Sequence, residues 1–217
     1  MSLAISFYNS HGITMSADRR IVTTVNRPTG IKESFVLTDT EQKLFQLSEQ
    51  CGLSITGSFS FNEIPLSSII NSYILSHDVE QVQPAEYLLS LAEYIKKLHN
   101  SDCDNCILIL SGYRNTNPFI LSSNTLNPSV HQHIEQGPTI TYSGENNLLG
   151  ILLNSEGFAY DYSGYTLQDS INFSKFMIRT VANLQKYQQT IQTVSEDCDV
   201  LCITPNKSQW IDCLSLR

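Results

Sequence analysis

Residues 2–20 decide the fold, and they read SLAISFYNSHGITMSADRR. Apolar and other side chains alternate from Leu3 to Tyr8 and again from Ile13 to Asp18, which is the period of a β-strand. The four residues between them, Asn9-Ser10-His11-Gly12, are turn-forming types. The stretch therefore predicts a β-hairpin over 3–18 that begins at a serine and ends in a charged cluster.

A second hairpin is predicted shortly after the first. QKLFQL at 42–47 and LSITG at 53–57 are strand-like and are separated by the turn EQCG. The intervening stretch 26–40 contains Pro28 and Gly30 and few regularly spaced apolar residues. We expect a loop or irregular excursion there.

Beyond residue 60 the apolar spacing changes to that of helices. Helices are predicted from Pro65 through Ile74, from Pro84 through Leu98, and from Thr166 to about Gln189. Ser60 with Glu63, and Thr166 with Asp169, are spaced as capping boxes for the first and third of these. Strands are predicted at 106–113, 118–123, 139–143, 199–204 and 209–214, and 146–153 is a helix or a strand.

This order of elements bears on the fold class. Runs of strands and runs of helices, rather than strict alternation, favour antiparallel sheets with helices outside them. The chain shows neither an internal repeat nor a linker-like stretch. We therefore expect one domain over 1–217.

Composition narrows the class of partner. The net charge of −8 and the pI near 5.0 argue against nucleic acid or an anionic membrane surface as the main partner. The sequence has no apolar run of membrane-spanning length and no signal-peptide pattern at its start. We expect a cytoplasmic protein whose six cysteines are reduced (51, 103, 106, 198, 202 and 213).

Charged residues gather at predicted strand ends near the amino terminus. Asp18, Arg19 and Arg20 close the first hairpin, and Lys43 opens the second. The plain interpretation is a set of solvated strand ends. The sharper one is an Asp–Arg–Lys cluster in which a lysine, held by an acid, lowers the pKa of a neighbouring amine.

At this point a resemblance becomes visible. SLAISFYNSHGITMSADRR resembles the opening of a proteasome β-type subunit, and QKLFQLSEQCGLSITGS resembles the second hairpin of that family. Lys43 and Gly57 stand as far apart as the family's lysine and its oxyanion-hole glycine. The layout is most similar to the bacterial proteasome-related branch that begins at Met and the nucleophile. The resemblance covers most of the chain in element order, with its specific motifs in 2–58.

The resemblance implies a fold and a set of site residues. The fold is an α+β, four-layer αββα sandwich of two antiparallel sheets with helices on both outer faces, as in N-terminal-nucleophile hydrolases. Ser2 takes the place of the family's nucleophilic threonine. The other implied catalytic-site residues are Asp18, Arg20, Lys43, Gly57, Ser143 and Ser195, and the implied substrate pocket is lined by Ile21, Phe45, Ile55 and Phe59.

The implied activity is cleavage of peptide or amide bonds without a cofactor or metal. A hydroxyl needs a base to become a nucleophile, and a free α-amine on the same residue can serve. This requires that Met1 be removed, which the small second residue permits. The family also implies a homo-oligomeric ring and an unfoldase as a possible partner.

Two departures and two alternatives accompany this hypothesis. Gln192 falls where the family has an aspartate, and serine replaces threonine and so lacks the methyl group that fixes the rotamer. One alternative is a non-catalytic, ring-forming structural or binding subunit of the same fold. The other is an amidase for a small metabolite.

Cysteines and histidines raise the question of a metal. Cys103 and Cys106 form a single CxxC motif, and His131 and His133 alternate as on a strand. Zinc sites of this kind commonly need two such pairs, and the sequence has no second CxxC. We therefore predict no metal site.

Overall fold

The computed structural model describes residues 2–27, 30–99, 105–154, 160–188 and 191–213. Most strands belong to two five-stranded antiparallel sheets. The first sheet has the order β12 (Thr139–Gly144), β1 (Leu3–Asn9), β2 (Gly12–Asp18), β13 (Cys198–Ile203) and β14 (Ser208–Asp212). The second has the order β11 (His131–Gln132), β10 (Asn117–Asn124), β9 (Cys106–Arg114), β6 (Cys51–Gly57) and β5 (Leu44–Ser48).

Both predicted hairpins are confirmed. In the first, Ala4 pairs with Ala17 and Asn9 with Gly12. In the second, β5 pairs with β6, so that Leu44 faces Ser54. The alternating side chains of β1 and β2 point to opposite faces of the first sheet, and both of these faces are buried.

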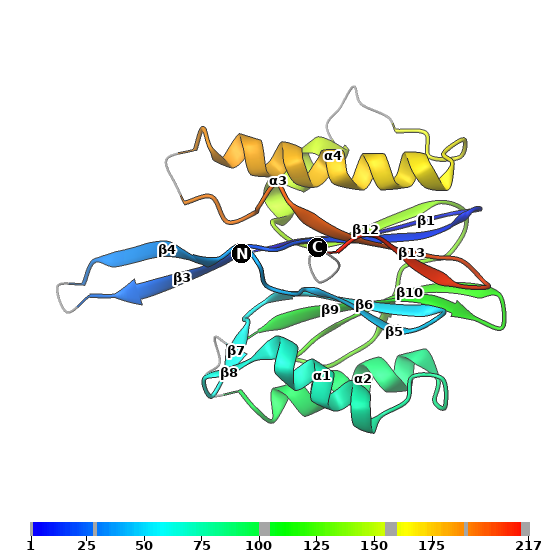
Figure 1. The fold of residues 1–217 in the computed structure, drawn as a ribbon, viewed down its shortest axis with the longest axis horizontal. Helices are drawn as coiled ribbons and strands as arrows, with labels where there is room; N and C mark the ends of the chain where they lie inside the picture. The colour runs from blue at the N-terminus through cyan, green and yellow to red at the C-terminus, as the bar shows by residue number, and fades with distance from the viewer. Residues whose placement is uncertain (1, 28–29, 100–104, 155–159, 189–190, 214–217) are drawn as a thin grey trace.

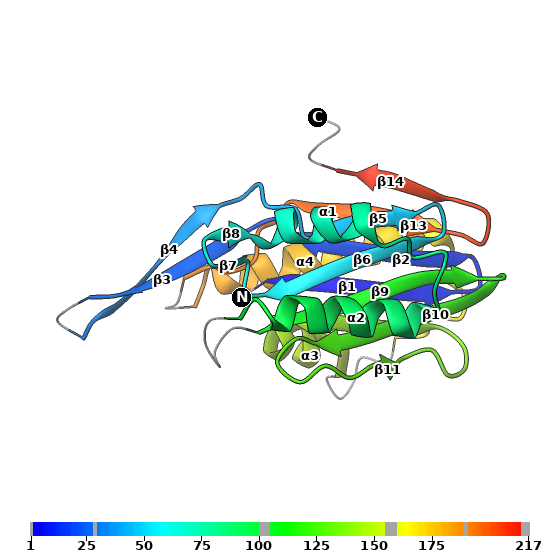
Figure 2. The same cartoon turned by 90° about the horizontal axis from the view of Figure 1, so that it is seen from below.

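Helices cover one face of each sheet, and the two remaining faces pack against one another. Helices α1 (Leu66–Ser76) and α2 (Pro84–Lys96) share an apolar cluster with the second sheet, and Figure 2 shows them side by side across it. Helices α3 (Asn146–Asn154) and α4 (Leu167–Gln185) pack on the first sheet (Figure 1). Residues with inward-facing side chains fill the space between the sheets: Ala4, Ile13, Met15, Ala17, Leu44, Tyr113, Leu201 and Ile203.

The expectation of a loop at 26–40 is wrong. Residues Ile21–Asn26 form β3 and Lys32–Thr38 form β4, which pair as an antiparallel ribbon that projects from the body of the molecule (Figure 1). Because the ribbon leaves the body, its residues are mostly exposed. It therefore has no buried face to impose an alternating pattern on the sequence.

The helix starts test the two capping predictions. Thr166 and Asp169 form the expected capping box at the start of α4. Ser60 and Glu63 do not cap α1, whose first turn follows Pro65 without a side-chain cap. Instead, β7 (Ser60–Phe61) and β8 (Ile64–Pro65) make a tight hairpin, with Asn62 and Glu63 at positive φ between them.

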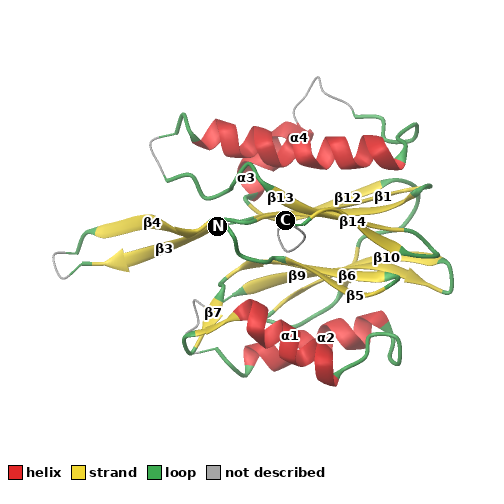
Figure 3. Cartoon of the chain, viewed as in Figure 1, coloured by secondary structure: helices red, strands yellow, loops and turns green. Residues whose placement is uncertain are grey.

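The predicted fold class is corrected by this secondary structure. Over the residues that the structure describes, the protein is mainly antiparallel β-sheet, with 40% strand and 26% helix in four short helices. The class expected from the resemblance, the α+β, four-layer αββα sandwich of N-terminal-nucleophile hydrolases, is not shown. Two physical reasons account for the difference: the exposed ribbon adds strand where a loop was expected, and α3 is only 9 residues long. Figure 3 shows strands filling the centre of the molecule and extending beyond it.

One sequence expectation concerned membranes. Within the described ranges, every helix is too short or too polar to span a bilayer.

Candidate active site

Lys43 directly precedes β5 and is completely buried. Its ammonium donates to Asp18 Oδ1 at 2.9 Å and to the Arg20 carbonyl oxygen at 2.5 Å. The same nitrogen lies 5.0 Å from the centroid of the Phe59 ring, within the range of a cation–π contact. Burial lowers the pKa of Lys43 below its ordinary value, although Asp18 opposes that effect.

Asp18 is the centre of the cluster. Its Oδ1 accepts from Lys43 and from the backbone N–H of Leu3 at 2.8 Å. Its Oδ2 accepts from the backbone N–H groups of Arg20 and Ser195, at 2.9 and 3.2 Å. These four donors match the four lone-pair positions of a carboxylate. One buried side chain thus ties the beginning of β1 to the lysine and to the segment that precedes β13.

Ser2 is held against the end of β12. Its side chain is buried, and its carbonyl oxygen accepts from the backbone N–H of Glu145 at 2.7 Å. Gly144 has a φ of +102°, and a Cβ there would lie 1.8 Å from the Ser2 carbonyl oxygen. Glycine at 144 therefore allows the close approach that fixes the backbone of Ser2.

Ser143 and Gly57 belong to different sheets but lie near one another. The Thr56 hydroxyl donates to the Ser143 hydroxyl at 2.9 Å, and both residues are buried. Gly57 follows Thr56 directly and has a φ of +108°. A Cβ at Gly57 would lie 2.2 Å from the Asn105 carbonyl oxygen, so no other residue fits this conformation without a backbone shift.

Ser195 joins the cluster, whereas the charge of Arg20 is directed away from it. The Ser195 hydroxyl accepts from the backbone N–H of Arg19 at 3.0 Å, in addition to the backbone bond to Asp18. The Arg20 guanidinium pairs with Asp39 through two hydrogen bonds, and this pairing raises the pKa of Arg20. The structure thus gives Arg20 two separate roles, a backbone contact to Asp18 and a side-chain contact to the ribbon.

Gln192 occupies the position at which the resemblance led us to expect an acid. Its side-chain amide donates to the Ala182 carbonyl oxygen, and its backbone carbonyl oxygen accepts from the Arg20 guanidinium. No hydrogen bond recorded for Gln192 in the described structure reaches Asp18 or Lys43. An acid is therefore not needed at 192 to complete the hydrogen bonds of this cluster.

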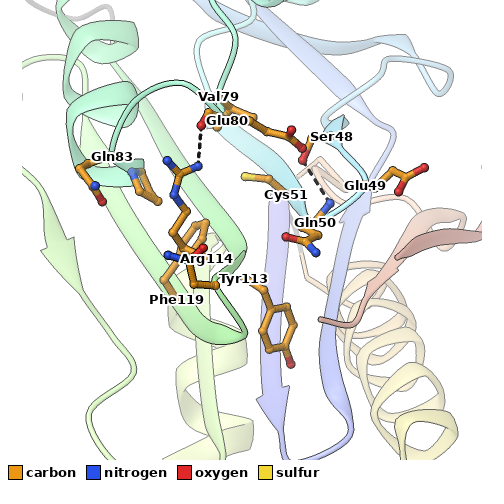
Figure 4. A pocket seen from close by; sticks show the side chains of 12 residues that line it. Ser48, Glu49, Gln50, Cys51, Val79, Glu80, Gln83, Tyr113, Arg114 and Phe119 are labelled. Carbon is orange, nitrogen blue, oxygen red and sulfur yellow. Dashed lines mark hydrogen bonds between the residues drawn. The ribbon is translucent and has the colours of Figure 1, made fainter. Parts of the chain in front are cut away.

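The structure places the four predicted pocket residues in different surroundings. Phe45 and Ile55 are buried in the apolar cluster between the second sheet and helices α1 and α2. Ile21 is half-buried at the start of β3, and Phe59 lies against Lys43. Neither the pocket shown in Figure 4 nor the other two large pockets of the described structure is lined by any of the four.

Two residues of the site were missed from the sequence. Arg19 is buried and donates to Asp199 Oδ1 at 2.6 and 3.0 Å, and this pairing offsets the cost of burying both charges. Thr56 supplies the hydroxyl that links the two sheets. For Arg19, the available signal was its partner Asp199, an acid in the otherwise apolar strand DVLCIT. For Thr56, the sequence offered no such signal.

The pocket shown in Figure 4, the largest of the three described here, lies far from this cluster. It has a volume of about 730 Å³ and is lined by the turns that join β5 to β6 and β9 to β10, together with residues 79–84 (Figure 4). Arg114 donates to the Glu80 carbonyl oxygen at its edge. Cys51, which lines it, and Gly57 stand at opposite ends of β6, about 20 Å apart for a seven-residue strand. Size alone therefore does not connect this pocket with the Lys43 cluster.

Among the described residues, no group of three or more His, Cys, Asp or Glu side chains is placed to hold a metal ion. Cys103 of the CxxC motif lies outside the described residues. No protein-family model matches the chain, and no curated protein matches its sequence.

Proposed function

We propose that the chain is an N-terminal-nucleophile hydrolase of the proteasome β type that cleaves peptide or amide bonds, with Ser2 as nucleophile once the Met1–Ser2 bond has been cut. One observation carries the proposal. A completely buried lysine–aspartate pair is hydrogen-bonded to the backbone N–H of the residue after Ser2. Burying two charges is costly, so a pair in this position calls for a role beyond stability.

In the proposed reaction, the Ser2 hydroxyl oxygen attacks the substrate carbonyl carbon. The α-amine of Ser2 takes the hydroxyl proton and then gives it to the leaving amine, so that an ester forms as the amide bond breaks. Water hydrolyses the ester by the same proton path in reverse. The Lys43 ammonium, fixed by Asp18, favours the neutral form of the α-amine through charge repulsion.

The negative charge that develops on the substrate oxygen needs a donor. The backbone N–H of Gly57 is proposed for this role, because a preorganised N–H donor stabilises an oxyanion. The Thr56–Ser143 hydrogen bond holds the end of β6 against β12, which supports the placement of Gly57 near Ser2. Ser143 and Ser195 are proposed as positioning residues.

A second candidate function is a non-catalytic structural or binding subunit. Two observations favour it: only 1% of Ser2 is exposed, and two of the four side chains expected to line a substrate pocket, those of Phe45 and Ile55, fill the core instead. Under this alternative the lysine–aspartate pair serves only to fix the start of β1. The hydrolysis experiment below separates the two functions.

Assembly and location are further parts of the proposal. We propose a homo-oligomer, in ring form, and an unfoldase as a possible partner. The support for self-association is the ribbon β3–β4, where Ile31, Phe35 and Leu37 are 59%, 45% and 63% exposed. We propose the cytoplasm as the location, a reducing compartment in which the six cysteines of the chain would remain thiols.

The direct test is turnover of fluorogenic peptide amides and of small-metabolite amides by the full chain. Ser2→Ala is expected to lower hydrolysis by about a thousandfold or more, because it removes the nucleophile. Ser68→Ala, at an exposed position on α1, is the matched control and is expected to leave turnover unchanged. Cleavage of small amides but not peptides would favour the amidase alternative. Equal turnover by the native chain and Ser2→Ala would overturn the proposed nucleophile.

A further inference from the structure

A pocket of about 530 Å³ lies between the ribbon and the layer of helices α3 and α4. The base of the ribbon contributes Val22, Thr24 and Ser34 to its wall. Further residues come from α3, from the end of α4 and from the segment before β13: Asn147, Leu148, Ile151, Gln185, Gln188, Ile191 and Thr193. Its size falls within the range of roughly 300–1,000 Å³ that is common for ligand pockets.

Glu145 also lines this pocket, and it is the feature that calls for a ligand. The residue is only 6% exposed. Among the described residues, the one side-chain donor to its carboxylate is the Gln185 amide, at 3.2 Å, and no lysine, arginine or histidine pairs with it. A buried carboxylate without a cation is costly, because few donors replace the water that it lost.

Gln185 holds this carboxylate in a fixed position. Its amide oxygen accepts from the backbone N–H groups of Thr193 and Val194, at 2.9 and 3.0 Å. Its amide nitrogen donates to the Thr193 hydroxyl and to Glu145. All donor and acceptor positions of the Gln185 side-chain amide are therefore used. This arrangement fixes the orientation in which the Glu145 carboxylate faces the pocket.

The remaining lining residues indicate what kind of ion would fit. The described residues that line the pocket include no basic side chain, so an anion has no partner there. They include a single carboxylate, whereas divalent cations such as calcium take several oxygen ligands. Val22, Leu148, Ile151 and Ile191 give the walls apolar patches. An ammonium or guanidinium on an apolar stem meets both requirements, as lysine and arginine side chains do.

We propose that this pocket binds the basic side chain of a lysine or arginine residue in a peptide, with Glu145 as the partner of its charge. The Glu145 backbone N–H donates to the Ser2 carbonyl oxygen, so this pocket residue is in backbone contact with the proposed nucleophilic residue. The proposal does not require Ser2 to be active, since it concerns binding alone.

The test is calorimetric titration of the full chain with Nα-acetyl-lysine methylamide and with Nα-acetyl-norleucine methylamide, which has a similar stem without the charge. The lysine compound is expected to bind at least about tenfold more tightly, as for a charge-assisted hydrogen bond. Glu145→Gln, which can still accept from Gln185, is expected to abolish this preference. Glu135→Gln, at an exposed position outside the pocket, is the control and is expected to keep it.

A second pair of variants covers the case in which Glu145→Gln fails to fold. Ser34 lies on the exposed ribbon at the wall of the pocket. Ser34→Arg supplies a tethered cation and is expected to block the lysine compound, whereas Ser34→Met is expected to retain the lysine preference. Equal binding of the two compounds to the native chain would overturn the proposal. Titration of Ser2→Ala keeps this result separate from hydrolysis, because lysine binding is expected to survive there.

Discussion

Lys43 Nζ lies 2.9 Å from Asp18 Oδ1, and neither side chain is exposed to solvent. The same carboxylate oxygen accepts the backbone N–H of Leu3. A lysine that opens one hairpin is therefore joined, through one acid, to the first strand of the other. The proposed function depends on this connection, and so does the stability of the amino-terminal strand.

The pair can be tested by a double-mutant cycle. Lys43→Met leaves Asp18 buried without its cation, and we expect a loss of roughly 3–5 kcal/mol in the free energy of unfolding. Adding Asp18→Asn removes the unpaired charge and is expected to recover part of that loss. Urea denaturation measures both, with Arg27→Met, in the exposed Arg27–Glu33 pair, as a control that costs less than about 1 kcal/mol. A Lys43→Met cost as small as the control's would show that the pair is not buried as described.

Gly57 is expected to tolerate no side chain. Gly57→Ala combines a φ of +108° with a Cβ placed 2.2 Å from the Asn105 carbonyl oxygen. We expect a loss of roughly 2–4 kcal/mol in the free energy of unfolding, measured in urea. Gly164→Ala is the control, since no atom lies within 4 Å of the added Cβ there and the backbone is not left-handed. Equal stability of the two variants would contradict the strained geometry at Gly57.

The sequence predicted the buried elements better than the exposed ones. Both hairpins and the capping box at Thr166 were predictable, because burial imposes a two-residue period on strands and the cap has its own chemistry. The ribbon β3–β4 was missed, since both of its faces meet solvent. Its valine, isoleucine and threonine content was the remaining signal, and such propensity is weak without a period.

The site was predictable only in part, and for a related reason. Asp18 and Lys43 could be placed from charged motifs at strand ends and Ser195 from the resemblance, and the structure brings the three together. The pocket residues could not, because the same apolar side chains can line a cavity or fill a core, as Phe45 does. The carboxylate of Glu145 was missed because its burial depends on Gln185, which is distant in sequence.

The stability of the protein at alkaline pH tests the burial of Tyr113, which lies near the end of β9. Burial raises the pKa of Tyr113 to about 12. An acid with a raised pKa contributes stability that is present below the unfolded value, near 10, and is lost as the pH rises through the folded value. The native chain is expected to lose free energy of unfolding between pH 10 and 12, and Tyr113→Phe is expected to lose roughly 1–3 kcal/mol less. Urea denaturation at each pH measures this free energy. The exposed Tyr187→Phe is the control, and a steeper loss in Tyr113→Phe would contradict the assignment.

The ribbon provides a test of assembly. If it mediates contacts between copies of the chain, Phe35→Ser with Leu37→Ser is expected to lower the molar mass measured by light scattering to that of one chain, 24.4 kDa. Leu75→Ser, which changes a leucine that is 90% exposed on α1, is expected to leave the mass unchanged. A native chain that is already monomeric at micromolar concentration would remove the support that the ribbon gives to a ring.

The most direct measurement is the intact mass of the native chain before and after treatment with a peptide epoxyketone, a reagent that needs both a hydroxyl and a free amine on one residue. The proposed function predicts that Met1 is absent, that one equivalent of reagent adds at Ser2, and that Lys43→Met slows the addition. A chain that retains Met1 and takes up no reagent would contradict it.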